Sequence, residues 1–190
     1  MLRDLIEKTR TYRRFHEDVP VSMDVLRDLI DLARIGASAA NLQPLKYILV
    51  NTPQQNARVF ETLAWAGYLT DWPGPEPGER PAAYVVILGD TTIAKKFDVD
   101  PGIAAQNILL GAVEKGLGGC MFGSVKRDQL RASFQIPGHL EILYAIALGK
   151  PRETIVLEPV GTDGSIRYYR DREGVHHVPK RALDEIIVNP

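Results

Sequence analysis

Two stretches near the start of the chain repeat apolar residues at helical spacing. The first, at positions 2, 5 and 6, gives way to the polar run KTRTYRRF and predicts a short helix that ends near Arg10. The second covers positions 26, 29, 30 and 33, begins after the favourable N-cap Ser22 and stops at Gly36. The pattern therefore predicts two helices, with basic residues directly after the first.

Four continuous apolar runs predict strands. KYILV (46–50), AYVVILG (83–89) and EILYAIALG (141–149) have the length and residue types of buried strands, and CMFG (120–123) is a shorter one. Near the C-terminus, SIRYYRDREGVHHVP contains two short β-like runs around a turn at 171–174, and the apolar stretch LDEII follows. We therefore expect strands both in the middle of the chain and near its end.

Helices are predicted between these strands. Thr52 caps a helix with Pro53 in its first turn, and this helix is expected to run to about Tyr68. Residues 103–117 are apolar on nearly all sides, as in a central buried helix, and residues 126–134 form a short helix. The segment DWPGPEPGERP (71–81) is rich in proline and glycine, so it holds no regular element and is either a mobile lid or a passive connector.

The order of these elements indicates the fold class. Strands and helices mix without strict alternation, which favours an α+β layer fold over a doubly wound parallel sheet. A chain of 190 residues fits one domain spanning 1–190, and folding at this size buries about 70% of the chain's surface.

Composition and charge exclude several functional classes. With 23 basic and 24 acidic residues the net charge is −1, so no global charge favours nucleic acid or an anionic membrane as partner. The longest apolar run, residues 82–88, is far short of a membrane span. Cys120 is the single cysteine, which excludes an internal disulfide and agrees with a reducing compartment; the cytoplasm is the expected location.

Basic residues gather at both ends of the chain. Arg10 and Arg13 follow the first helix, and Lys180 and Arg181 lie near the C-terminus. An arginine fork grips two phosphate oxygens at once, so the two clusters could form one phosphate site if the ends of the chain meet. The alternative is that both clusters are solvated surface charges.

The loop GASAANLQPL, after the second helix, is more polar than a turn requires. Asn41 and Gln43 each offer donors and an acceptor, which suits the edge of a heterocyclic ring, whereas Ser38 and Asn41 could instead satisfy free backbone groups in a capping loop. Other candidates are weak: Cys120 lies on an apolar run as a buried hydrophobe would, and the adjacent His176 and His177 would point to opposite faces of a strand, which disfavours a shared metal.

Four segments in order, RTYRRF, SAANLQP, GIAAQNILLGAVEKGLGG and GVHHVPKRALDEI, resemble the FMN-dependent nitroreductase family. The first arginine of the family's N-terminal motif is Thr9 here and its serine is Thr11, while Ala37 and Leu45 replace a proline and a common tryptophan. The resemblance implies that the following residues bind the cofactor FMN: Arg10, Thr11, Arg13, Ser38, Ala39, Asn41, Gln43, Met121, Phe122, Gly123, Lys180 and Arg181.

The resemblance also implies an architecture and a reaction. The architecture is an α+β fold whose central, mostly antiparallel sheet is flanked by helices, in an intertwined homodimer with FMN at the interface. The reaction is a ping-pong oxidoreduction in which NADH or NADPH reduces the flavin and a small molecule such as a nitroaromatic or quinone reoxidises it, with no side chain needed as acid or base. Alternatives are a relative that performs reductive dehalogenation or flavin breakdown, and a flavin-binding sensor or carrier without turnover.

Overall fold

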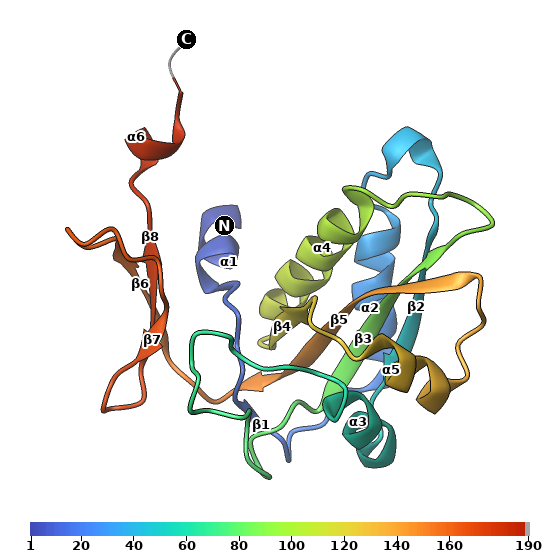
Figure 1. The fold of residues 1–190 in the computed structure, drawn as a ribbon, viewed down its shortest axis with the longest axis horizontal. Coiled ribbons are helices and arrows are strands. Elements are labelled where there is room, and N and C mark those ends of the chain that lie inside the picture. Colours follow the sequence, from blue (N-terminus) through green and yellow to red (C-terminus); the bar gives the residue numbers. More distant parts are fainter. Residues whose placement is uncertain (189–190) are drawn as a thin grey trace.

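A central antiparallel sheet organises the computed structural model, which describes residues 1–188 (Figure 1). The strands β1 (Phe15–His16), β5 (Leu140–Pro151), β3 (Ala83–Asp90) and β2 (Leu45–Val50) lie in that order, and β4 (Gly118–Phe122) also pairs with β5. Every pair in this sheet is antiparallel. Together with the flanking helices, this confirms the α+β prediction.

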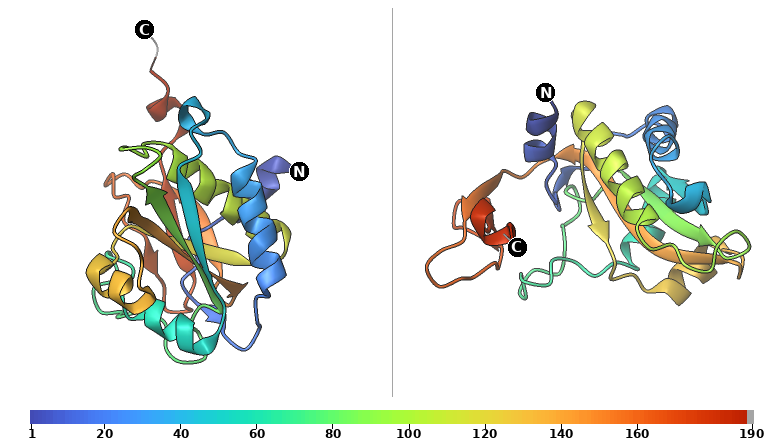
Figure 2. Two further views of the ribbon diagram at one scale, coloured as in Figure 1. Left: turned by 90° about the vertical axis from the view of Figure 1, so that its right-hand side faces the viewer. Right: turned by 90° about the horizontal axis from the view of Figure 1, so that it is seen from above.

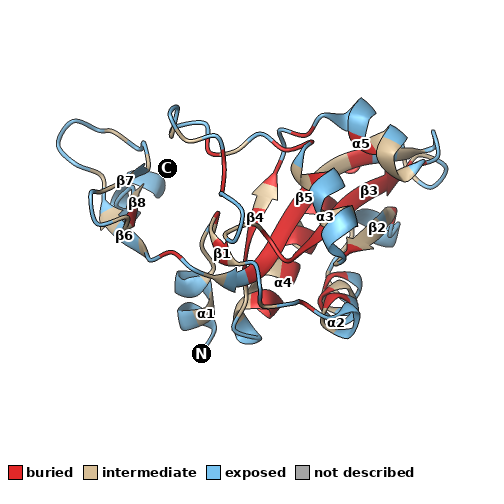
Figure 3. Ribbon diagram, turned by 90° about the horizontal axis from the view of Figure 1, so that it is seen from below, coloured by how far each residue is buried: buried red, intermediate tan, exposed pale blue. Residues whose placement is uncertain are grey.

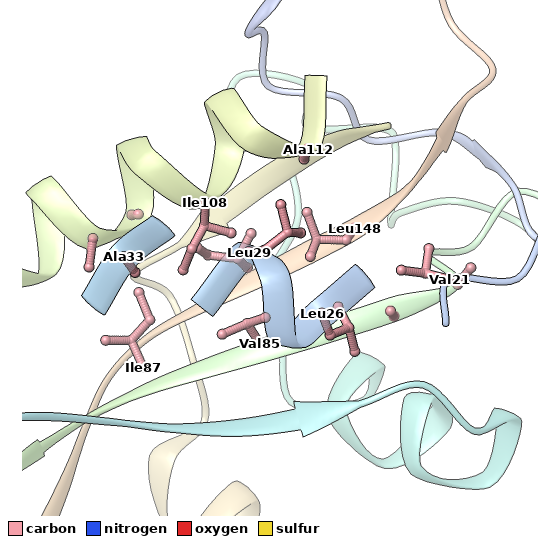
Figure 4. Close-up of a cluster of buried hydrophobic side chains, with 14 residues drawn as sticks. Val21, Leu26, Leu29, Ala33, Val85, Ile87, Ile108, Ala112 and Leu148 are labelled. Carbon is pink, nitrogen blue, oxygen red and sulfur yellow. The ribbon is translucent and has the colours of Figure 1, made fainter. Parts of the chain in front are cut away.

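One face of the sheet is covered by α2 (Met23–Arg34) and α4 (Asp100–Glu114). Alternate residues of β3, Val85 and Ile87, point to this side and pack with Leu29 of α2 and Ile108 of α4 (Figure 4). Ser22 caps α2 as predicted, because its hydroxyl accepts a hydrogen bond from the Val25 backbone at 3.2 Å.

The opposite face is covered by α3 (Pro53–Phe60) and α5 (Arg127–Phe134). Here the other residues of β3, Tyr84 and Val86, pack with Val59 and Leu130. All eight residues of β3 are buried, since helices cover both faces, and this explains why the strand has a continuous apolar run instead of alternation.

A second, three-stranded sheet lies beside α1 (Leu2–Lys8) and apart from the central sheet (Figures 1 and 2). Its strand β8 (His176–Lys180) pairs in parallel with β6 (Ile155–Pro159) and antiparallel with β7 (Tyr169–Arg170). The helix α6 (Leu183–Ile186) follows. Most of this C-terminal part is exposed or half-buried, in contrast to the buried central strands (Figure 3).

The prediction that the helix after Thr52 runs to about Tyr68 is wrong, because α3 ends at Phe60. The Thr62 side chain donates to the Val59 carbonyl at 2.7 Å, and Leu63 then forms a β-bridge with Val125. The local hydrogen bond and the long-range bridge turn the chain away from the helix axis. Strand β6 was not predicted either, whereas the two runs flanking the turn at 171–174 are present as β7 and β8.

Residues 71–81 contain no helix or strand, as predicted. The C-terminal end of the segment is held in place by Glu79, which forms ion pairs with Arg14 and Arg152. Near its start, Trp72 packs edge-on against Trp65 at 6.1 Å between ring centroids. These contacts fit a connector, and the alternative of a mobile lid stays a prediction. No helix among residues 1–188 is long and apolar enough to cross a membrane.

Candidate functional site

Segments near the two ends of the chain meet in one pocket of about 250 Å³, here called the basic pocket. The segment after α1 contributes Arg10, Thr11 and Arg13, and β8 contributes Lys180. Three cationic side chains therefore converge although 167 positions separate Arg13 from Lys180 (180 − 13). The structure thus brings residues of both basic clusters together, and the arrangement suits a phosphate group; that they bind one stays a prediction.

Arg13 is the most unusual member of the basic pocket. It is only 7% exposed, yet among residues 1–188 no carboxylate pairs with its guanidinium. The neighbouring Arg14 and Arg170 do form such pairs, with Glu79 and Glu153. Because burying an unpaired charge is costly, an unpaired cation in this position indicates a site for an anion.

Neutral groups hold the Arg13 guanidinium in place. It lies 4.6 Å from the centre of the Tyr168 ring, donates to the Thr11 carbonyl at 3.3 Å and lies 3.2 Å from Nε2 of His176. Arginine can only donate, so His176 accepts through Nε2 and carries its proton on Nδ1. Arg10 adds a buried Nε that has no partner among residues 1–188. Both arginines thus retain hydrogen-bonding capacity for a ligand.

Burial and the positive charges of Arg13 and Arg170 lower the pKa of His176 to about 4. This imidazole is 1% exposed and therefore stays neutral across the physiological range. His177 points the opposite way, as predicted for adjacent strand residues, and its ring nitrogens each lie 3.0 Å from a carboxylate oxygen, of Asp171 and of Glu158. These two acids raise the pKa of His177 above its ordinary value.

We predict that the two adjacent histidines titrate far apart in an NMR pH series. His177 should stay protonated beyond pH 6.5, and its stabilising bridge, fully present below that pH, should be lost as the pH rises through the raised pKa. His176 should stay neutral in the folded protein. Stability should therefore fall as the pH drops from about 6.5 towards about 4, because over this range the unfolded chain binds the proton and the folded chain does not.

Asp171→Asn should lower the His177 pKa and leave that of His176 unchanged. Titration of both rings near pH 6.5 would contradict this arrangement.

Glu153 fastens the N-terminal segment to the second sheet. Its side chain is 1% exposed, accepts hydrogen bonds from the backbone of Arg13 and Arg14, and pairs with Arg170 at 3.0 Å. One carboxylate therefore joins the segment after α1, the turn before β6 and strand β7. The basic pocket lies directly beside this junction, since Arg13 belongs to both.

The polar loop after α2 is built around Asp100, the first residue of α4. The Asp100 carboxylate accepts from the Ser38 hydroxyl at 2.6 Å and from the Ala39 backbone at 2.8 Å, and Ser38 in turn accepts from the Gln43 backbone at 2.9 Å. Ser38 thus satisfies a backbone group, as the capping alternative proposed. Three residues without glycine's freedom, Ala40, Asn41 and Gln43, have φ of 49°, 56° and 52°. Such backbone conformations concentrate at binding sites.

A second pocket, of about 170 Å³ and here called the loop pocket, lies under this loop. Ser38, Gln43, Tyr47 and Asp100 are among its lining residues. Burial, with a contribution from Asp100, raises the pKa of Tyr47 to about 12, so the phenol is a neutral hydrogen-bonding group. The exposed Asn41 and Gln43 side chains hydrogen-bond to each other at 3.2 Å. The loop thus presents amide groups beside the pocket.

The segment 121–123 lies at the end of β4. Phe122 is buried against Trp65, with ring centroids 4.7 Å apart, while Gly123 is exposed and Met121 half-buried. A ligand could therefore meet the backbone of this segment but not the Phe122 ring. The neighbouring Cys120 is buried as predicted, and burial raises its pKa to about 12, which disfavours a nucleophilic thiolate.

The structure divides the twelve predicted cofactor-binding residues into three groups. Arg10, Thr11, Arg13 and Lys180 line the basic pocket; Ser38 and Gln43 line the loop pocket; Ala39, Asn41, Met121, Phe122, Gly123 and Arg181 line neither. Sequence reasoning missed Asp100, Glu153 and His176 as parts of these sites. The dipeptide Asp100-Pro101 at a helix start was a usable signal for the first, but the other two act only through distant partners.

Known proteins share this fold. A protein of Methanothermobacter thermautotrophicus, provisionally named as an NADH dehydrogenase or NAD(P)H nitroreductase, is 29% identical over 159 residues, which are 79% of this chain and 78% of the relative. The crystal structure of a nitroreductase family protein from Streptococcus pneumoniae aligns over 100% of both chains with a TM-score of 0.72 and 18% identity. An FMN-dependent nitroreductase from Clostridium difficile aligns over 78% of this chain and 87% of its own, with a TM-score of 0.64 and 22% identity. Residues 6–150, most of the chain, match the sequence profile of the nitroreductase family, and the protein therefore belongs to that family.

Proposed function

We propose that the protein is an FMN-dependent oxidoreductase that takes electrons from NADH or NADPH and passes them to a small oxidised acceptor such as a nitroaromatic or a quinone. The single observation that carries the proposal is the buried Arg13, whose guanidinium has no carboxylate partner within residues 1–188, beside Arg10 and Lys180 in the basic pocket. Membership of the nitroreductase family and the FMN and NAD(P)H in its relatives' names support it.

The residues present fit the phosphate of FMN. Arg10, Arg13 and Lys180 would bind the terminal phosphate, with the Thr11 hydroxyl as an additional donor. The unpartnered Nε of Arg10 supports this assignment, because a buried donor needs an acceptor. His176 would keep Arg13 oriented without competing for the phosphate, since its imidazole is neutral.

Bound FMN would supply the hydride chemistry through its own ring, so the side chains have other tasks. The loop built on Asp100 would present the Asn41 and Gln43 amides to the ring edge, and the backbone of 121–123 would lie along the ring. Ser38 and Asp100 would fix the loop without contacting the reacting atoms. Because no side chain needs to transfer a proton in this scheme, replacing an acid or a histidine should lower turnover only as far as it weakens folding or flavin binding.

The decisive experiment is to purify the protein, release its ligand by heat and measure the ligand's mass. We expect FMN near one per chain; stoichiometric FAD, or an inability to bind FMN, would refute the proposal. Anaerobic mixing with NADH and with NADPH should then bleach the flavin absorbance, and an acceptor screen should restore it. A flavin-binding sensor or carrier would hold FMN but show negligible reduction, and a dehalogenating relative would respond to a halogenated acceptor.

We further propose a homodimer whose two flavin sites are shared between subunits. The elements that line the basic pocket, β8 and the segment after α1, lie on one side of α4, whereas the loop after α2 lies on the other side (Figure 1). This separation within one chain supports a site in which a second chain supplies the loop. An open groove of about 350 Å³ between α1, α2 and α4 is lined by apolar residues such as Leu32, Ile35 and Leu110, which a second copy would cover. Exposed apolar side chains of α6, Leu183 and Ile186, offer a matching surface.

Mixing two defective chains tests this sharing. One chain carries Arg10→Ala/Lys180→Ala and the other carries Asn41→Ala, and the FMN concentration is set so that neither chain alone retains flavin. With random pairing after joint refolding, half of the dimers are mixed and each holds one intact site, so roughly one quarter of all sites should regain FMN. If one chain supplied both clusters, every site would keep one defect and no flavin should return. A dimer of the wild-type chain refolded in parallel sets the full signal.

A further inference from the structure

The loop between α3 and β3 reaches from the central sheet to the second sheet through residues 65–72, here called the aromatic strap (Figure 1). Both tryptophans of the chain lie in it. At one end Trp65 packs on Phe122 of β4, with ring centroids 4.7 Å apart. At the other end the Arg170 guanidinium of β7 lies over the Trp72 ring, 4.9 Å from its centre. The strap therefore contacts both sheets.

The middle of the strap touches the wall of the basic pocket. The Tyr68 ring packs on the Tyr168 ring with 4.9 Å between centroids, and the Tyr68 backbone N–H donates to the Tyr168 hydroxyl at 3.4 Å. The Arg167 guanidinium lies 5.3 Å from the centre of the Tyr68 ring. Tyr168 lines the basic pocket, whereas Tyr68 does not. Tyr168 thus stands between the strap and the basic pocket.

In the pocket, Tyr168 supports Arg13 without using any of its donors. The guanidinium lies 4.6 Å from the centre of the Tyr168 ring, and this contact is attractive because the face of an aromatic ring is negative. The Arg13 side chain makes two hydrogen bonds within residues 1–188, with Thr11 and His176, and both use Nη1. Its Nη2 and Nε therefore keep their N–H groups for a ligand, and a planar set of donors suits phosphate.

Tyr168 needs support of its own. It directly precedes β7, and six of the seven residues before it, 161–167, are exposed. Two rings hold it: His176 of β8, with 5.2 Å between centroids, and Tyr68 of the strap. Tyr68 is the support that comes from outside the second sheet. Without Tyr68, the half-buried Tyr168 ring would regain rotamer freedom and would spend less time against Arg13.

We propose that Tyr168 is a positioning residue for the flavin phosphate, and that the aromatic strap holds it in place through Tyr68. This inference rests on the proposed function, because it needs an anion at Arg13. Tyr168 acts on the guanidinium that meets the phosphate and not on the flavin ring. Its contribution should therefore favour FMN over riboflavin, which has the same ring system and no phosphate.

Equilibrium dialysis of the full chain against FMN and against riboflavin measures this preference as the ratio of two dissociation constants. Tyr168→Leu should weaken FMN binding about tenfold, the size of one cation–π contact to a desolvated cation, and leave riboflavin binding nearly unchanged. Tyr68→Leu lies outside the pocket, yet it should lower the preference for FMN about threefold, because it removes one aromatic pair. A variant that only damaged the fold would weaken both flavins equally.

Two further variants are the matched controls. Tyr168→Phe keeps the ring, its contact with Arg13 and its packing on Tyr68, so it should retain the wild-type preference. Tyr169→Leu removes the adjacent tyrosine, which stacks on His177 with 4.7 Å between centroids and does not line the basic pocket. It should also retain the wild-type preference.

The outcomes separate this inference from the proposed function. If the wild type bound FMN no more tightly than riboflavin, the basic pocket would hold no flavin phosphate, and both would fail. If the wild type preferred FMN and Tyr168→Leu kept that preference, or lost both flavins equally, only the positioning role would be overturned. An unchanged preference in Tyr68→Leu would overturn the part assigned to the strap.

Discussion

An Arg10→Ala/Lys180→Ala protein is expected to lose FMN during purification. Both cations line the basic pocket, and neither forms an ion pair with a carboxylate within residues 1–188. Each charge-assisted hydrogen bond contributes about 1.5–3 kcal/mol, so removing two should weaken FMN binding by about 3–6 kcal/mol. That corresponds to an affinity loss of at least about a hundredfold, measurable by fluorescence titration of the apoprotein. Arg13 is left in place because it also packs against Tyr168 and His176.

Arg181→Ala is the matched control for this experiment. Sequence reasoning paired Arg181 with Lys180 as phosphate ligands, but Arg181 is exposed, lies outside the pocket lining and is 3.9 Å from Glu185. We expect its removal to leave FMN affinity within about threefold of the wild type, as for other exposed pairs. If Arg181→Ala weakened binding as much as Lys180→Ala alone, the phosphate would lie closer to α6 than the basic pocket indicates.

Glu153→Ala is expected to destabilise the protein by about 3–5 kcal/mol, a large part of the stability of a typical domain. The substitution leaves the Arg170 cation without its partner and two backbone N–H groups, of Arg13 and Arg14, without their acceptor. Urea unfolding at a fixed excess of FMN measures the loss as a lower midpoint. The second sheet should separate first, since Glu153 links it to the N-terminal segment.

Glu185→Ala provides the corresponding control. This glutamate is about as exposed as its partner Arg181, and their 3.9 Å separation makes a weak surface pair. Its removal should change the free energy of unfolding by less than about 1 kcal/mol. Equal midpoints for Glu153→Ala and the wild type would show that the N-terminal segment and the second sheet do not depend on this carboxylate.

The central strands and helices were predictable because short sequence patterns specify them. The continuous apolar run of β3 follows from burial on both faces, and α2 has a cap, an apolar stripe and a stop within its own sequence. The end of α3 was not predictable, because a bridge from Leu63 to Val125 decides it. Strand β6 has three exposed residues of five and no alternating pattern, so no local signal marked it.

The candidate site also contains residues that were predictable from the sequence and residues that were not. Charged and amide residues in short motifs identified Arg10, Arg13 and the loop around Asn41 before the fold was known. Asp100, Glu153 and His176 contact the loop after α2 or the N-terminal segment, 61 to 163 positions away, and a single sequence contains no pattern at that separation. The family resemblance predicted which motifs bind the cofactor, but it did not predict the residues that hold those motifs in place.

The contact between Arg13 and His176 has a consequence for biosynthesis. A ribosome releases the N-terminus first, so the arginines emerge long before the strand that completes their pocket. The nascent chain can build the central sheet once residue 151 is available, but the basic pocket must wait until residue 180 has left the exit tunnel. In the proposed scheme the flavin phosphate can bind only after β8 has emerged, and a stop codon between residue 151 and β8 would yield a chain able to form its main sheet but without the complete basic pocket.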